Sequence, residues 1–124
     1  GHLLGESAFI SAAQRALKAS GSTLEAYPQG HGSMLQSLDL LLIPPELIII
    51  RGEQEGTLNK WKSYANAGYH PHRLSFAIAN NETALPGFLA ERKPQGEIVA
   101  YICRGTECQA PITEFEEFTR IVGP

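Results

Sequence analysis

The two cysteines of the chain, Cys103 and Cys108, lie five positions apart in the stretch from Tyr101 to Pro111. Two thiols at this spacing could form a disulfide, exchange it with other thiols, or ligate a metal. Gly105 lies between them and gives the backbone the freedom to turn back. Such a turn can bring their Cα atoms within the roughly 4.4–6.8 Å that is usual for a disulfide. Arg104 is the candidate modulator of the pair, because a neighbouring cation favours the thiolate form.

Three interpretations of this pair remain open. The pattern favours two semi-buried thiols, because free cysteine packs as a small hydrophobe. A local disulfide comes second. A zinc site that adds His70 and His72 has the right number of ligands, but their spacing matches no recognised ligand pattern. We therefore expect neither a metal nor a cofactor.

A loop at residues 51–56, Arg-Gly-Glu-Gln-Glu-Gly, follows an expected strand, where α/β folds often hold phosphate. It lacks the glycine pattern of nucleotide-binding loops. Glu53 and Glu55 suit a helix N-terminus but would repel a phosphate. A solvated loop is therefore favoured.

Four polar or aromatic residues lie around the N-terminal helices. Tyr27 and His31 are weak candidates for facing a ligand, and Glu25 and Asp39 accompany them. The favoured interpretation is that all four are ordinary surface residues, because polar loop residues need no further explanation.

The elements that would position these residues change character at Glu46. Before it, apolar spacing predicts a helix over 7–19, a loop over 22–32 with one helical turn at its start, and a helix that Ser33 caps and Pro44 ends. After it, we expect strands at 47–50, 74–79 and 97–103, helices at 57–67 and from Thr113, and a short apolar piece at 88–90. Thr113 and Glu116 have the spacing of a capping box.

This alternation predicts an α/β fold: a small three-stranded, mainly parallel sheet flanked by helices. The third strand should be central, because its nearly unbroken apolar run requires cover on both faces. Residues 3–45 form a helical unit and residues 46–124 form the α/β domain. The two leading helices do not belong to the alternation, which suggests that they come from the end of a helical array.

Composition narrows the class of protein. The chain has 124 residues, 43% of them hydrophobic, 19% charged, and a formal net charge of −3. Its basic residues are scattered, so we expect no nucleic-acid partner. Its longest apolar stretch is interrupted well short of the about 20 residues that a membrane span needs. With two cysteines only, a reducing cytoplasm is the default expectation.

Several segments together resemble a known family. The run Pro45–Ile50, Leu89, and the block Ala100–Arg104 followed by Cys108–Thr113 resemble the C-terminal end of thioredoxin-domain proteins related to spermatogenesis-associated protein 20 and to bacterial YyaL. The resemblance covers about residues 30–122, and more loosely the first helix. Residues 105–107, Gly-Thr-Glu, depart from the family's pattern inside the block.

The resemblance implies a protein of three parts: a thioredoxin-like domain, a helical toroid of the six-hairpin glycosidase type, and a C-terminal α/β tail. This chain would hold the last helices of the toroid and the tail. It would act as a non-catalytic scaffold or interaction domain, while the intact protein acts in carbohydrate metabolism or thiol chemistry. The alternative is a small redox or ligand-binding module that acts through Cys103 and Cys108.

The expected partner is the remainder of the same polypeptide, or a second copy of the chain. Without that cover, apolar side chains should be exposed around Met34, Leu35 and Leu38.

Overall fold

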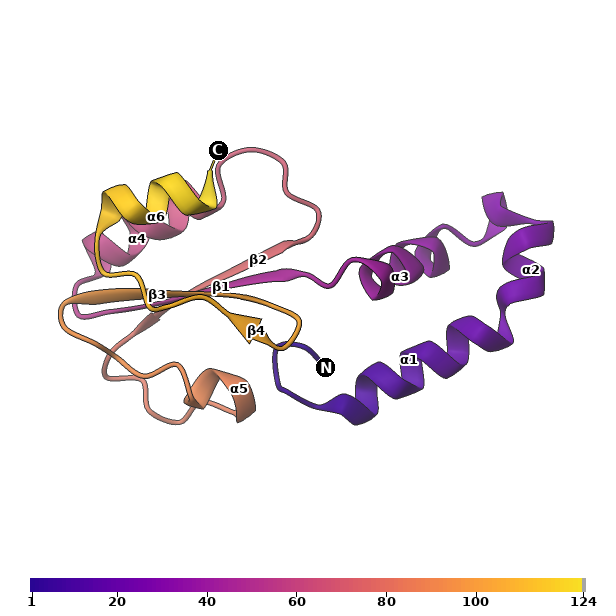
Figure 1. Cartoon of the computed structure of the whole chain (residues 1–124), viewed down its shortest axis with the longest axis horizontal. Helices are drawn as coiled ribbons and strands as arrows, with labels where there is room; N and C mark the ends of the chain where they lie inside the picture. The colour runs from indigo at the N-terminus through magenta and orange to yellow at the C-terminus, as the bar shows by residue number, and fades with distance from the viewer. Residues whose placement is uncertain (124) are drawn as a thin grey trace.

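The apolar run Leu47–Ile50 forms the middle of a four-stranded sheet (Figure 1). The structure, a computed structural model, describes residues 1–123. An unbroken apolar run suits a strand that is buried on both faces, and these four side chains have no exposed surface. In spatial order the strands are β2 (Arg73–Ala79), β1 (Glu46–Gly52), β3 (Ile98–Arg104) and β4 (Glu107–Cys108).

Helices cover the sheet and form an arm beside it. The helices of the arm are α1 (Ser7–Ala19), α2 (Gly21–Ala26), the 3₁₀ helix η1 (Pro28–Gly30) and α3 (Gly32–Leu42). Those of the sheet domain are α4 (Glu55–Ala65), α5 (Gly87–Ala90) and α6 (Phe115–Val122).

The two faces of the sheet have separate cores, because successive strand side chains point to opposite faces. On one face, Ile48, Ile50, Ala100 and Ile102 pack against α4 and α6, where the rings of Trp61 and Phe118 lie 4.6 Å apart.

On the other face, Ile49, Val99 and Tyr101 pack against Leu89 of α5. Leu3, Leu85 and Phe88 complete this second core.

The direction of β3 differs from the prediction. β1 and β2 are parallel, but β3 runs antiparallel to β1, and β4 runs antiparallel to β3. β3 begins at the end of the sheet where β2 ends, because Gly52 pairs with both Ala79 and Ile98. A parallel third strand would need the connection to return to the opposite end of the sheet before the strand began. The predicted α/β class is confirmed, but the sheet is mixed and has four strands, so the prediction of a mainly parallel three-stranded sheet is wrong in strand direction and in strand count.

Other expectations fare differently. The helix predicted over 7–19 has those bounds, and β3 is an inner strand whose residues Val99–Cys103 are buried. The capping box is not formed: α6 begins at Phe115 after the N-cap residue Glu114, so Thr113 lies outside the helix. Ser33 was expected to cap the second long helix, but it lies inside α3, whose N-cap residue is His31.

The arm extends from one end of the sheet as two antiparallel helices, α1 and α3, joined by α2 at the tip (Figure 1). In α3, all of whose residues are described, none is buried. Leu35, Leu40, Leu42 and Ile43 are exposed, as expected for this region, and Met34 and Leu38 are half-buried. The interior of the arm rests mainly on Leu17 and Leu24.

A buried arginine holds the loops at the far end of the sheet. Arg51 is the last residue of β1 whose side chain points to the second face, and it is 3% exposed. Its guanidinium donates to the carbonyl oxygens of Arg92, Ala79 and Glu82 at 3.0, 3.2 and 2.8 Å. Burial lowers the pKa of Arg51 from its usual value, because desolvation penalises the charged form, but arginine stays protonated at neutral pH.

We predict that Arg51→Lys lowers the free energy of unfolding by about 2–3 kcal/mol. The single ammonium group of lysine cannot reach carbonyls on separate loops, and buried acceptors would lose charge-assisted hydrogen bonds. Urea denaturation measures the change. Arg104→Lys is the control, because that side chain is 66% exposed and its replacement should cost less than about 1 kcal/mol. Equal effects of the two variants would contradict the role assigned to Arg51.

Candidate functional site

The two cysteines lie on a tight hairpin that Gly105 makes possible. β3 and β4 pair with Cys103 opposite Cys108 and Arg104 opposite Glu107, which leaves Gly105 and Thr106 as the loop. Gly105 has a φ of +61°, and a glycine with positive φ at the first loop position is typical of a type II′ turn. After β4 the chain stays beside β3, where Ile112 forms a bridge to Ala100.

Cys103 and Cys108 form a disulfide, with their Cα atoms 4.0 Å apart. Gln109 N donates to Ile102 O at 2.9 Å, so the cysteines occupy the neighbouring non-hydrogen-bonded position of the ladder. Directly opposed side chains approach most closely at such positions. From the sequence, two free thiols were the favoured interpretation. The two-residue turn that places the cysteines opposite each other could not be recognised there.

The two sulfurs belong to residues with opposite exposure. Cys103 is 1% exposed on the inner strand β3, whereas Cys108 lies on the edge strand β4 and is exposed. An external reagent therefore meets Cys108 first.

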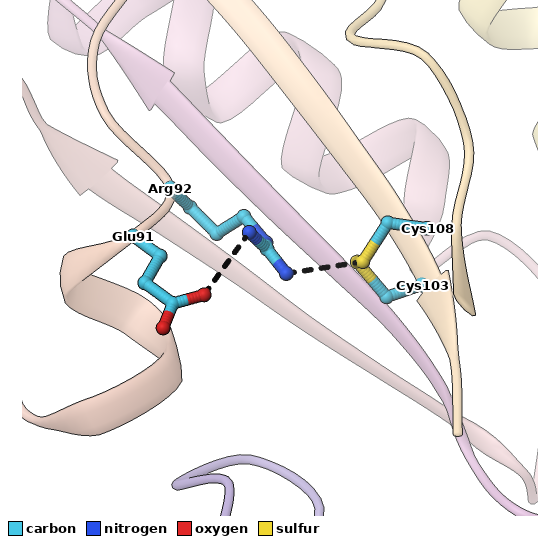
Figure 2. Close-up of a disulfide and its surroundings, with 4 residues drawn as sticks. All are labelled: Glu91, Arg92, Cys103 and Cys108. Atoms are coloured by element: carbon cyan, nitrogen blue, oxygen red, sulfur yellow. Dashed lines mark hydrogen bonds and ion pairs between the residues drawn. A yellow bond between two sulfur atoms is a disulfide. The ribbon is translucent and has the colours of Figure 1, made fainter. Parts of the chain in front are cut away.

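Arg92 is the cation that contacts the disulfide (Figure 2). Its Nη2 lies 3.1 Å from Cys108 Sγ, and its guanidinium stacks 3.8 Å from the centre of the Phe88 ring. The Arg92 side chain is 15% exposed, and its Nη1 lies 3.7 Å from the exposed carboxylate of Glu91. Among the described residues, its buried Nε has no hydrogen-bond partner.

The loop that carries Arg92 is fixed from two sides. Arg51 Nη1 donates to the Arg92 carbonyl at 3.0 Å, and the Tyr101 hydroxyl donates to the Lys93 carbonyl at 2.6 Å. Gln95 Nε2 donates to the same hydroxyl at 3.1 Å. Buried groups of β1 and β3 therefore hold the backbone that carries the Arg92 side chain.

Arg104, the sequence candidate for modulating the thiols, has a different partner. Its Nη2 donates to Glu46 Oε1 at 3.3 Å. Because Arg104 is the strand neighbour of Cys103, its side chain leaves the opposite face of the sheet. Arg92 lies sixteen positions from Cys108 and is not among the candidate residues of the sequence. No signal in the sequence singles out Arg92 from the other arginines.

The remaining candidates are not brought together with the cysteines. Tyr27 and His31 flank η1 at the tip of the arm, where Tyr27 is exposed. His70 Nε2 forms a hydrogen bond with Ala67 O at 2.9 Å, and His72 Nε2 lies 2.9 Å from Asp39 Oδ2. Within the described part of the chain, no group of three or more His, Cys, Asp or Glu side chains could hold a metal ion.

A hollow of about 570 Å³ lies where β1 and β2 end, beside the N-terminus of α4. Its lining includes Glu53 and Glu55, with Asn80, Asn81 and Lys62. This is the crevice in which open α/β sheets often bind ligands. The two carboxylates make it unsuited to phosphate, which agrees with the favoured interpretation of residues 51–56.

No family model, curated protein or solved structure matches this chain. Over residues 1–123, no helix is long and apolar enough to cross a membrane.

We predict that Cys108→Ala lowers the free energy of unfolding by about 2 kcal/mol. A disulfide stabilises by restricting the unfolded chain, and this one closes a short loop, with a sequence separation of 5. Cys103→Ser should cost at least as much, because it also buries a hydroxyl at a 1% exposed position.

Urea melts with and without dithiothreitol measure both effects, and reduction of the wild-type chain should reproduce Cys108→Ala. Thr106→Ala, in the exposed hairpin loop, serves as the control. A wild-type melt that does not respond to reduction would mean that the disulfide contributes no stability.

Proposed function

We propose that this chain is a non-catalytic interaction domain of a larger protein of the thioredoxin-domain/six-hairpin type. Its α1–α3 arm packs against further helices of the same polypeptide, and its sheet domain holds the base of the arm. The observation that carries this proposal is the row of exposed apolar side chains on the arm: Phe9, Leu40, Leu42 and Ile43.

The two long helices of the arm do not fill the space between them. A hollow of about 390 Å³ is lined by Leu17, Leu24, Leu38 and Leu41, and another of about 230 Å³ by Phe9, Ile10 and Leu40 among others. Helices normally pack by inserting the side chains of one between those of the next. Apolar hollows of this kind suit the side chains of additional helices.

The arm is held to the sheet domain at both of its ends. Leu3 packs in the core of the second face, and Phe88 N donates to Leu4 O at 3.4 Å. At the other end, α3 leads directly into β1, and Asp39 of α3 pairs with His72 at 2.9 Å. Anchoring at both ends limits how the arm can move, so its apolar surface is presented in a defined orientation. The Leu3 side chain and the Leu4 carbonyl thus contact the sheet domain.

The resemblance of the Tyr101–Pro111 block supports the family part of the proposal. On this basis the intact protein acts in carbohydrate metabolism or thiol chemistry and resides in the cytoplasm. The domain needs neither a cofactor nor nucleic acid for its interaction role.

We predict that Leu42→Gln leaves the isolated domain almost unchanged but destabilises the intact gene product. Leu42 is 71% exposed, so the substitution should change the unfolding free energy of the isolated domain by less than about 0.5 kcal/mol. Burial against further helices would make the same change cost about 1.5–3 kcal/mol in the intact protein. Thermal melts and limited proteolysis of both forms measure the difference.

Gln36→Ala is the matched control, because Gln36 is an exposed polar residue of the same helix. Equal effects of Leu42→Gln in the two forms would overturn the proposal. If light scattering instead shows a dimer of the isolated domain that Leu42→Gln dissociates, the arm binds a second copy of the chain.

A second candidate function is a redox module that acts through Cys103 and Cys108. One observation favours it: the guanidinium of Arg92 lies within hydrogen-bond distance of the Cys108 sulfur.

A further inference from the structure

We propose that the β3–β4 hairpin is a thiol–disulfide exchange site, in which Cys108 is the reactive sulfur, Cys103 the resolving thiol and Arg92 the stabiliser of the Cys108 thiolate. The substrate class is an accessible disulfide, or a dithiol in the reverse direction. This assignment rests on the second candidate function, the redox module, and does not depend on the docking role of the arm.

The difference in exposure sets the order of reaction. An external thiolate can reach a sulfur on the exposed edge strand β4, while Cys103 is 1% exposed in the inner strand. Thiol exchange requires a direct approach of the attacking sulfur. Cys108 is therefore the sulfur that bonds to a partner, and Cys103 is the one that closes the internal disulfide.

The contact with Arg92 favours the reduced state of Cys108. Sulfur in a disulfide is a weak hydrogen-bond acceptor, whereas a thiolate carries a full negative charge. The 3.1 Å contact from Arg92 Nη2 is therefore stronger after the S–S bond breaks than before. Arg92 can make the Cys108 sulfur a better leaving group only because it stabilises the thiolate more than the disulfide.

The surroundings of Arg92 preserve this effect. Its side chain is 15% exposed and covers the Phe88 ring, so solvent screens its charge only weakly. The nearest carboxylate, Glu91, is 3.7 Å from Nη1 and 69% exposed, and neutralises the guanidinium poorly. The hydrogen bonds from Arg51 and Tyr101 fix the loop, so little reorganisation is needed when the thiolate forms.

The reaction balances as follows. The Cys108 thiolate attacks a substrate disulfide, one substrate sulfur leaves as a thiolate and takes a proton from water, and a mixed disulfide forms on Cys108. Cys103 then loses its proton to water and attacks Cys108 Sγ, which releases the second substrate thiolate. Two electrons have passed from the chain to the substrate, and the Cys103–Cys108 bond has formed. A dithiol reduces the chain by the reverse steps.

The test measures alkylation of the reduced chain by iodoacetamide across a pH series, with peptide mapping by mass spectrometry. We expect Cys108 to react at least about tenfold faster than Cys103 at pH 7. Arg92→Gln should slow alkylation of Cys108 about tenfold at that pH and move the midpoint of its pH–rate profile upward. Arg92→Lys should restore part of the rate, because it keeps the charge.

Arg104→Gln is the matched control, since it removes the same charge beside Cys103 on the opposite face. Near-UV circular dichroism confirms that each variant is folded. A separate assay follows mixed-disulfide formation by Cys103→Ala with oxidised glutathione, which Arg92→Gln should slow by a similar factor.

The proposal is overturned if the two cysteines react at equal rates, or if Arg92→Gln and Arg104→Gln behave alike. It is also overturned if dithiothreitol reduces the disulfide only when the chain unfolds, because the bond would then be a structural link. Leu42→Gln should leave alkylation unchanged, so failure of the docking proposal would not affect this result.

Discussion

Strand β1 must be covered on both faces, and the other elements of the sheet domain are arranged by that requirement. Its residues Leu47–Ile50 have no exposed surface. One face is covered by α4 and α6, and the other by α5 together with Leu3 from the N-terminal segment. A strand with only one apolar face could have left the second face in water. The need to cover both faces explains why the segment before the arm contacts the sheet. It also explains why residues 80–97 pack on the second face.

Near the end of the same strand lies Arg51, which links the core to the candidate site. A guanidinium buried without a carboxylate partner is costly, and here carbonyl oxygens from two separate segments accept hydrogen bonds from both of its terminal nitrogens. Its buried Nε has no hydrogen-bond partner among the described residues. One of them belongs to Arg92. The buried cation thus fixes the backbone of a second arginine, whose side chain reaches the Cys108 sulfur. Packing and the chemistry proposed for the hairpin therefore depend on one set of contacts.

The arm and the hairpin offer different kinds of surface. The arm presents exposed leucines and apolar hollows, which suit other helices. The hairpin instead presents, at a sheet edge, the Cys108 sulfur in contact with the Arg92 guanidinium. A two-residue edge strand limits unwanted strand pairing, because it exposes few free backbone groups. The edge can therefore carry an exposed sulfur without also acting as a template for another strand. The two proposed roles use separate residues and can coexist in one domain.

The sequence alone determined where the main elements lie, because their signals are local. The apolar run of β1 and the helical spacing over Ser7–Ala19 need no distant partner to be recognised. The antiparallel direction of β3 was decided by the tertiary structure, since it depends on how the loop after β2 crosses the sheet. The disulfide also required the register that places Cys103 opposite Cys108. Arg92 meets Cys108 only because α5 and its following loop pack on the second face, a contact between residues sixteen positions apart that no local pattern encodes.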